Sequence, residues 1–250
     1  MKPIALQLYT LREACAEDFA GTLKKVAEIG YKGVEFAGLH GMEPREVKAI
    51  VDDLGLSVCS SHVPVFRTEN LEELIEQEKT LGNTRLVGGF GRDTFNTADD
   101  CKRAAERLAE VSAKLNEAGM TLGYHNHWWE FQPVEGVVPH EVLMSAAPEV
   151  FPQLDVYWVA FGGADPVETV RKYRERACLL HIKDGTLKEG EPHTAVGAGV
   201  LDMPAIIGAA DPNVLEWLIV ELDHCATDME EAVRESYRYL TESGLAEGNK

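Results

Sequence analysis

The 250-residue sequence has no hydrophobic run of the roughly 20 residues that a membrane-spanning helix needs. Residues 1–8 are apolar, but Arg12 and Glu13 follow too soon for a membrane span or a secretory signal. We therefore expect residues 1–8 to contain the first strand of the fold.

Cysteine is also scarce, and it occurs in no Cys-x-x-Cys pair. The five cysteines are odd in number and far apart: Cys15, Cys59, Cys101, Cys178 and Cys225. This pattern argues against a disulfide framework and against a thiolate zinc site, and it favours a reducing compartment. We expect five buried, inert thiols and a cytoplasmic protein.

Positive charge is in short supply. Lys and Arg number 24 against 42 Asp and Glu, which gives a net charge of −18. A surface of this sign repels phosphate backbones and anionic lipid, so we expect no nucleic-acid partner and no membrane partner. With 45% hydrophobic and 26% charged residues, the chain otherwise has the composition of an ordinary soluble globular protein.

One pattern recurs along the chain: an amphipathic helix, a glycine, a few residues and then an apolar strand. It occurs as LKKVAEIG-YKGVEF, VKAIVDDLG-LSVCSS, IEQEKTLG-NTRLVGG and KLNEAG-MTLGYH. The glycines stand where a helix needs a left-handed residue to end: Gly30, Gly55, Gly82 and Gly119. Helix starts are indicated by Asn70, Thr97 and the pair Asp165-Pro166, and the longest helix is expected over about 98–118.

Eight short apolar segments rich in β-branched residues are expected to be strands. They lie near 4–9, 33–36, 56–60, 84–88, 120–125, 152–156, 178–182 and 217–221. Their apolar runs are nearly continuous, as in parallel strands covered by helices, and eight strands with intervening helices indicate an α/β fold, the (β/α)8 TIM barrel. An open doubly wound sheet is the competitor, but no glycine-rich turn follows the first strand. We expect one domain over residues 1–250.

Polar residues gather at the ends of the expected strands, where the loops of such a barrel converge. They are Glu35, His62, the segment 124–130, Asp155, His181, Lys183, Asp184, Glu221 and Asp223. Several lie in apolar surroundings, where an unpaired charge is costly, and a shared cation would satisfy many of them together. Asp155, His181 and Glu221, with a carboxylate from the loop after the fifth strand, would suit Mn²⁺, Mg²⁺ or Co²⁺, with Zn²⁺ as a further option.

Each of these residues also has a structural interpretation. A lone histidine such as His125 or His127 is more often a hydrogen-bonded core residue than a ligand. Glu35 or Asp223 pairs with a barrel lysine or arginine about as often as it binds a substrate. Tryptophans such as Trp158 more often pack than contact a ligand, although indole faces also stack on sugars.

The ordered set of motifs resembles the sugar phosphate isomerase/epimerase family, which is part of the xylose isomerase-like TIM-barrel superfamily. The motifs are QLYTLR, GYKGVEF, YHNHWWEF, LDVYW, HIKDG, GAG-x-x-D and VELD, and the resemblance covers nearly the whole chain. It implies one divalent ion, Mn²⁺ by preference, bound by Asp155, His181 and Glu221. In many relatives the fourth ligand is a glutamate within the fifth strand, where this sequence has Gly123; Glu130 is the expected replacement, with His125 and His127 as alternatives.

The resemblance implies an isomerase or epimerase that removes a proton alpha to the carbonyl of a small sugar, sugar phosphate or keto-polyol. Glu221 and Glu130 would form the acid–base pair, and Lys183 would polarise the carbonyl or a neighbouring hydroxyl. Residues expected to bind the substrate are His62, His127, Trp158 and Glu35. A dehydratase acting on a keto-inositol or a 3-keto-sugar is the alternative, because the histidines at 62 and 127 offer an extra acid for expelling hydroxide.

Two further classes are less compatible with the sequence. The apurinic-site endonuclease branch of the superfamily needs additional histidines, and this chain has Trp158 and the segment 88–92 at the corresponding places. A non-catalytic sugar-binding barrel would need a broken ligand set. The turn 197–199 could offer N–H groups to a substrate phosphate or could simply lead into the last helix. A homodimer is the assembly that the resemblance implies.

Overall fold

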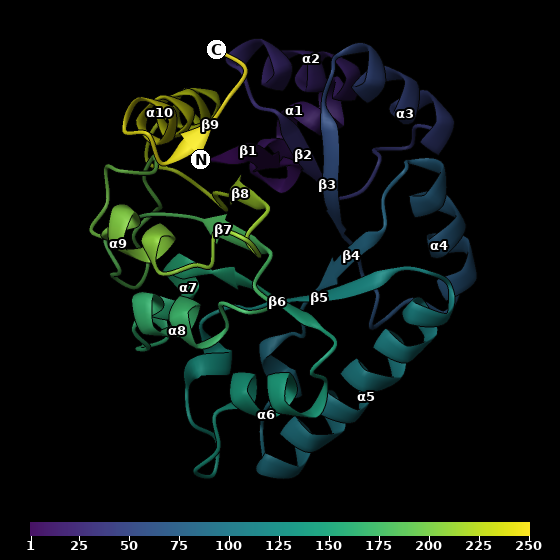
Figure 1. Ribbon diagram of the computed structural model, residues 1–250, viewed down its shortest axis with the longest axis vertical. Coiled ribbons are helices and arrows are strands. Elements are labelled where there is room, and N and C mark those ends of the chain that lie inside the picture. Colours follow the sequence, from purple (N-terminus) through teal and green to yellow (C-terminus); the bar gives the residue numbers. More distant parts are fainter.

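The computed structural model describes residues 1–250 and shows a closed barrel of eight parallel strands surrounded by helices (Figure 1). The strands are β1 (Lys2–Gln7), β2 (Gly33–Phe36), β3 (Ser57–His62), β4 (Arg85–Gly88), β5 (Thr121–His125), β6 (Phe151–Asp155), β7 (Leu179–Ile182) and β8 (Trp217–Val220). Each strand pairs with the next one along the chain, and β1 pairs with both β8 and β2, which closes the ring. The predicted single-domain (β/α)8 barrel is confirmed.

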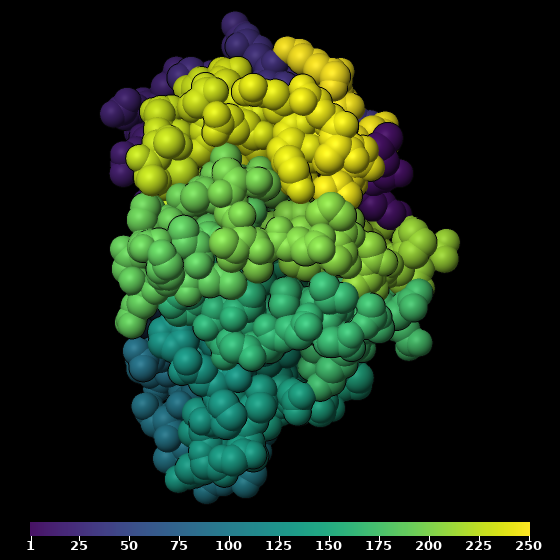
Figure 2. Space-filling view, turned by 90° about the vertical axis from the view of Figure 1, so that its left-hand side faces the viewer, coloured from purple at the N-terminus to yellow at the C-terminus, as the bar shows by residue number.

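The helices lie outside the strands. They are α1 (Arg12–Glu17), α2 (Phe19–Ile29), α3 (Pro44–Asp53), α4 (Leu71–Thr80), α5 (Ala98–Glu117), α6 (Pro139–Ala146), α7 (Val156–Phe161), α8 (Pro166–Lys172), α9 (Met203–Gly208) and α10 (Met229–Glu242), with 3-10 turns at Leu8–Leu11, Arg92–Thr94 and Trp129–Phe131. A two-residue strand, β9 (Ala246–Glu247), pairs with the start of β1. The C-terminal segment therefore lies against the N-terminal one, the yellow and purple regions of Figure 2.

The helix boundaries follow the local chemistry that the sequence indicated. The side chains of Asn70, Thr97 and Asp165 accept hydrogen bonds from backbone N–H groups in the first turns of α4, α5 and α8. The four glycines that end the repeated helices all have positive φ, as a left-handed helix end requires.

The barrel interior divides into an apolar lower layer and a polar upper layer. The lower layer is a cluster of six buried residues: Ala5, Cys59, Val87, Phe151, Leu179 and Ile219. Because side chains of a strand alternate between its two faces, the residue two positions after Leu179 also points into the barrel, and it is His181. The same spacing leads from Ile219 to Glu221. Polar side chains therefore lie above the apolar lower layer, at the carboxyl ends of the strands.

Two other expectations concern the thiols and the membrane. All five cysteines are free, but only Cys15, Cys59 and Cys101 are buried; Cys178 and Cys225 are partly exposed, which corrects the expectation for those two. None of the helices combines the length and the apolar character that a membrane crossing requires.

Candidate functional site

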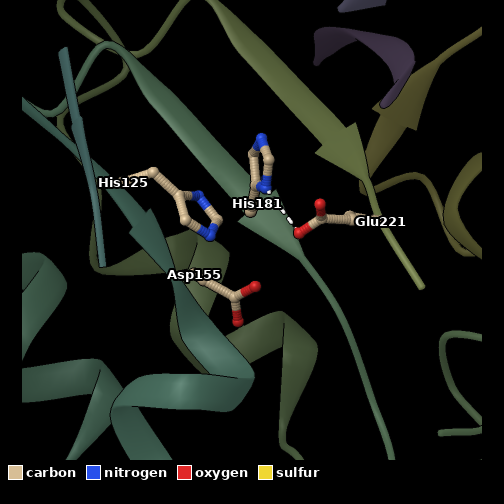
Figure 3. A group of neighbouring side chains, drawn as sticks. All are labelled: His125, Asp155, His181 and Glu221. Carbon is tan, nitrogen blue, oxygen red and sulfur yellow. Dashed lines mark hydrogen bonds and ion pairs between the residues drawn. The ribbon is translucent and has the colours of Figure 1, made fainter. Parts of the chain in front are cut away.

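Four buried side chains meet at the carboxyl end of the barrel: His125, Asp155, His181 and Glu221 (Figure 3). Their ligand atoms all lie within 4.8 Å of one another. They come from the ends of β5, β6 and β7 and from the residue directly after β8. We call this set the four-residue group. Asp155 stands opposite His181 in the β6–β7 register, so adjacent strands bring these residues together although they are 26 positions apart in the sequence.

Two glutamines and a glutamate support the group from below. Oε1 of Gln153 accepts a hydrogen bond from Nδ1 of His125 at 3.1 Å, and Gln7 donates to Oε1 of Glu35. The same Glu35 oxygen lies 2.9 Å from Nε2 of His181, whose Nδ1 lies 3.0 Å from Oε2 of Glu221. The carboxylate of Glu35 thus orients His181, as carboxylates behind metal-ligating histidines do. Gln7 and Gln153 were not predicted as site residues, and the only signal for them in the sequence is their position in the strand segments QLY and QLD.

Lys183 is the only other cation in this region. It is fully buried, and its Nζ lies 2.9 Å from Oδ2 of Asp155, 2.9 Å from Oε2 of Glu221 and 2.8 Å from Oδ2 of Asp223. The ammonium therefore holds three carboxylates together, and two of these, Glu221 and Asp223, line the cavity described below. Lys183 itself does not line the cavity, which corrects the expectation that it polarises a substrate.

Opposite charges shift the pKa values of these groups strongly. Burial by itself would lower the pKa of His181, but the flanking Glu35 and Glu221 carboxylates raise it to about 10. Burial would raise the pKa of Glu221, but Lys183 and then His181 hold it well below its ordinary value. For Asp155 burial dominates over the attraction of Lys183, and its pKa is raised. Negative groups exceed positive ones here, since four carboxylates share two cations: Glu35, Asp155, Glu221 and Asp223 against His181 and Lys183.

The donor set fits a divalent metal ion. Two imidazoles and two carboxylates lie within reach of one position, and the only partner of Oδ2 of Asp155 is the Lys183 ammonium, which also serves Glu221 and Asp223. The excess of carboxylates over cations provides a second reason for a bound cation.

The structure does not bring Glu130 into the four-residue group. Its Oε1 accepts a hydrogen bond from the Tyr124 hydroxyl at 2.8 Å, and its Oε2 accepts one from the backbone N–H of His127 at 2.9 Å. Glu130 is fully buried and lies outside the cavity wall, so it holds the loop after β5 in place. His125, one of the two alternatives, occupies the fourth position.

Packing explains why Gly123 carries no ligand. A Cβ atom at this position would lie 2.4 Å from the ring of Phe151, which fills the barrel interior at that level. No side chain fits there, and the next inward-facing residue of β5, His125, supplies the donor instead.

A cavity of about 650 Å³ opens above the group. One wall carries the carboxylates of Glu221 and Asp223, and another carries the imidazoles of His62 and His127, with Trp158 also in the lining. Three of the four residues expected to bind substrate therefore line the cavity. The fourth, Glu35, is buried beneath it and contacts His181.

The turn 197–199 has no free N–H groups for a phosphate. The N–H groups of Gly197 and Gly199 donate to Oδ2 of the buried Asp184 at 3.0 and 3.2 Å. The alternative left open by the sequence is decided by this side chain, which anchors the loop after β7.

Comparison with known proteins agrees with this architecture. The family model described as xylose isomerase-like TIM barrel matches residues 23–243. The chain therefore belongs to the xylose isomerase-like TIM barrel family, and it is an enzyme of the superfamily of sugar isomerases, epimerases and dehydratases.

Three relatives illustrate the range of this superfamily. An inosose dehydratase from Clostridium perfringens is 27% identical in an alignment 268 positions long, gaps included. The alignment covers 90% of this chain and 89% of the relative. An inosose dehydratase from Lacticaseibacillus casei is 22% identical in an alignment 244 positions long, which covers 82% of each protein. The solved structure of a sugar phosphate isomerase/epimerase from Parabacteroides distasonis superposes with a TM-score of 0.81 at 27% identity, covering 98% of this chain and 96% of that one.

Proposed function

We propose that this protein is a metal-dependent dehydratase that acts on a keto-polyol or keto-sugar ring. The observation that carries the proposal is the cavity above the four-residue group, which has a carboxylate wall of Glu221 and Asp223 and an imidazole wall of His62 and His127. Such walls provide a base on one side and a proton donor on the other.

The metal would be held by His125, Asp155, His181 and Glu221. A divalent ion at this place would polarise a substrate carbonyl and acidify the neighbouring C–H bond. With two imidazole donors the set suits Mn²⁺, Co²⁺ or Zn²⁺ better than Mg²⁺, which prefers all-oxygen surroundings.

The side chains then carry out an elimination. The carboxylate of Glu221 takes the proton alpha to the carbonyl, and the electron pair of the broken C–H bond forms a carbon–carbon double bond. The C–O bond to the β-hydroxyl breaks, and an imidazole of the opposite wall, at position 62 or 127, gives a proton to the departing hydroxide. The net change is the loss of one water molecule from the substrate.

The position of Glu130 favours this reaction over epimerisation. The expected pair of carboxylates on opposite faces of the substrate does not form, because Tyr124 and the His127 backbone occupy both oxygens of Glu130. The relatives from C. perfringens and L. casei, both inosose dehydratases, support the same choice.

Isomerisation or epimerisation is the second candidate. His62 ends β3 and His127 follows β5, and both strands flank β4, which lies opposite β8 in the eight-stranded ring. A proton taken by Glu221 on one face therefore has an acid–base group near the other face. The likeness to the Parabacteroides distasonis structure supports this candidate.

The test is a screen of keto-inositols, 3-keto-sugars, ketoses and their phosphates with Mn²⁺ in D₂O, followed by NMR and mass spectrometry. Dehydration produces an unsaturated product lighter by one water, whereas epimerisation produces a deuterated product without that loss. Glu221→Gln should lower turnover by at least about 100-fold, because general acid–base catalysis is lost. The matched control is Glu216→Gln, at the start of β8 on the other end of the barrel. A Glu221→Gln variant that holds metal and turns over at the parental rate would show that Glu221 is not the base.

A further inference from the structure

A second hollow of about 390 Å³ lies beside the catalytic cavity. The two share four lining residues, His62, Val63, Pro64 and His127, so only these side chains stand between them. The second hollow continues over the loops that follow β3 and β4, on the side away from Glu221 and Asp223.

Its walls differ in chemistry from those of the catalytic cavity. The rings of Phe66 and Phe90 stack with centroids 4.2 Å apart, and Trp129 belongs to the same lining. The one charged side chain in the lining is the exposed Arg67, so the hollow contains no carboxylate. Both phenylalanines are nearly buried, so the hollow meets the edges of these rings rather than their faces. An apolar aromatic lining beside a hydrogen-bonding cation is suited to a ring that has apolar surface and hydroxyl groups at its edge.

A series of ring contacts connects the two compartments. His125 of the four-residue group lies 5.1 Å from His127 between ring centroids, and His127 stacks on Trp129 at 4.2 Å with an interplanar angle of 10°. One end of this series touches the group and the other lines the second hollow. A ligand anchored at the group therefore reaches the second hollow by passing His127.

We propose that the second hollow binds a ring substituent of the substrate, so that the enzyme acts on a keto-sugar that carries a further ring through a glycosidic oxygen. This inference rests on the proposed function. The catalytic cavity alone is within the range of roughly 300–1,000 Å³ that small-molecule sites have, so the second hollow provides room beyond the reacting ring. Both a sugar ring and an aromatic ring have apolar surface that such a lining can cover.

The experiment compares three glycosides of one keto-sugar that carry a methyl, a phenyl or a glucosyl group. The parent enzyme should show a kcat/KM for the ring-bearing substrates about tenfold above that for the methyl glycoside, because a ring there buries more apolar surface against the lining. The relative values for phenyl and glucosyl identify which kind of ring fits better.

Gly91→Leu should remove this preference by filling the hollow. Its backbone φ of −71° accepts a side chain, and the atoms nearest a Cβ there belong to the flexible side chains of Asp93 and Arg67. Gly208→Leu is the matched control, because nothing lies within 4 Å of a Cβ at that position. The measured quantity is the ratio of kcat/KM values, so a general loss of activity does not imitate the effect.

Equal kcat/KM for methyl and ring-bearing substrates in the parent, or an unchanged ratio in Gly91→Leu, would overturn the inference. If no keto-sugar is turned over at all, the proposed function fails. The second hollow is then tested by ligand binding alone. Saturation-transfer NMR should then detect the phenyl ring bound to the parent and not to Gly91→Leu, and equal binding to both would refute the second compartment.

Discussion

Asp184 is expected to stabilise the loop after β7 more than any ordinary capping residue does. This buried carboxylate accepts four backbone hydrogen bonds, from Gly185, Gly197, Gly199 and Leu201, at 2.9 to 3.3 Å. Asp184→Ala removes all four acceptors without adding bulk. The loop then loses the single side chain that connects its two ends.

The size of the effect follows from the fate of these N–H groups. Hydrogen bonds to a charged acceptor contribute about 1.5–3 kcal/mol each. The sum over four such bonds is an upper bound on the stability that Asp184→Ala loses, and the net loss is smaller. The N–H groups of Gly197, Gly199 and Leu201 lie near the surface and can bind water, whereas Gly185 is buried. Removing the carboxylate also removes the cost of burying it. We expect a net loss of about 3 kcal/mol in the free energy of unfolding.

The assay is urea unfolding of the metal-free protein, followed by tryptophan fluorescence, with limited proteolysis to report on the loop. The control is Asp202→Ala in the same loop, which removes one capping hydrogen bond to Ala205 and should cost about 1 kcal/mol. If Asp184→Ala costs no more than Asp202→Ala and the loop resists protease equally well, the four hydrogen bonds do not stabilise it as argued.

Three more outcomes follow from the buried charges. Metal analysis should find that Asp155→Asn loses bound Mn²⁺ and that Glu130→Gln keeps it, because only Asp155 belongs to the four-residue group. Equal loss in both variants would show that Glu130 is a metal ligand. Lys183→Met should lower the unfolding free energy of the metal-free protein by about 3–5 kcal/mol, since three carboxylates lose a buried cation, and Mn²⁺ should restore part of it; an unchanged urea midpoint would contradict this. Burial raises the pKa of Glu78, so the folded state favours its protonated form. The parent protein therefore loses stability as the pH rises from the ordinary pKa of a glutamate to the raised pKa of Glu78. Glu78→Gln should lack this loss, and parallel stability curves for parent and variant between about pH 4 and pH 8 would disprove it.

Local patterns in the sequence were sufficient for the architecture. A glycine that ends a helix acts within one turn, and a capping side chain such as that of Thr97 reaches only the N–H groups next to it. Eight apolar strands separated by amphipathic helices leave few closed arrangements, so the barrel and the end at which polar residues gather were predictable. Asp155, His181 and Glu221 were identified together for the same reason.

The fourth member of the group required tertiary structure. His125 and Glu130 are five residues apart in one loop region, and both side chains are chemically able to bind a metal. The choice depends on the Tyr124 hydroxyl, which binds Glu130, and on the Phe151 ring, which fills the space at Gly123. Neither contact can be predicted from the periodicity of apolar residues in the sequence.

The sequence by itself determined that eight parallel strands would present Asp155, His181 and Glu221 at one rim, because side-chain alternation is a local property of a strand and alternating strands and helices favour a barrel. Only the tertiary structure decided how the charges there are divided. Lys183 forms ion pairs with three carboxylates, and Asp184 accepts hydrogen bonds from the N–H groups of Gly197 and Gly199 that a phosphate would need. These pairings depend on distances between residues far apart in the sequence, which are set only when the barrel closes.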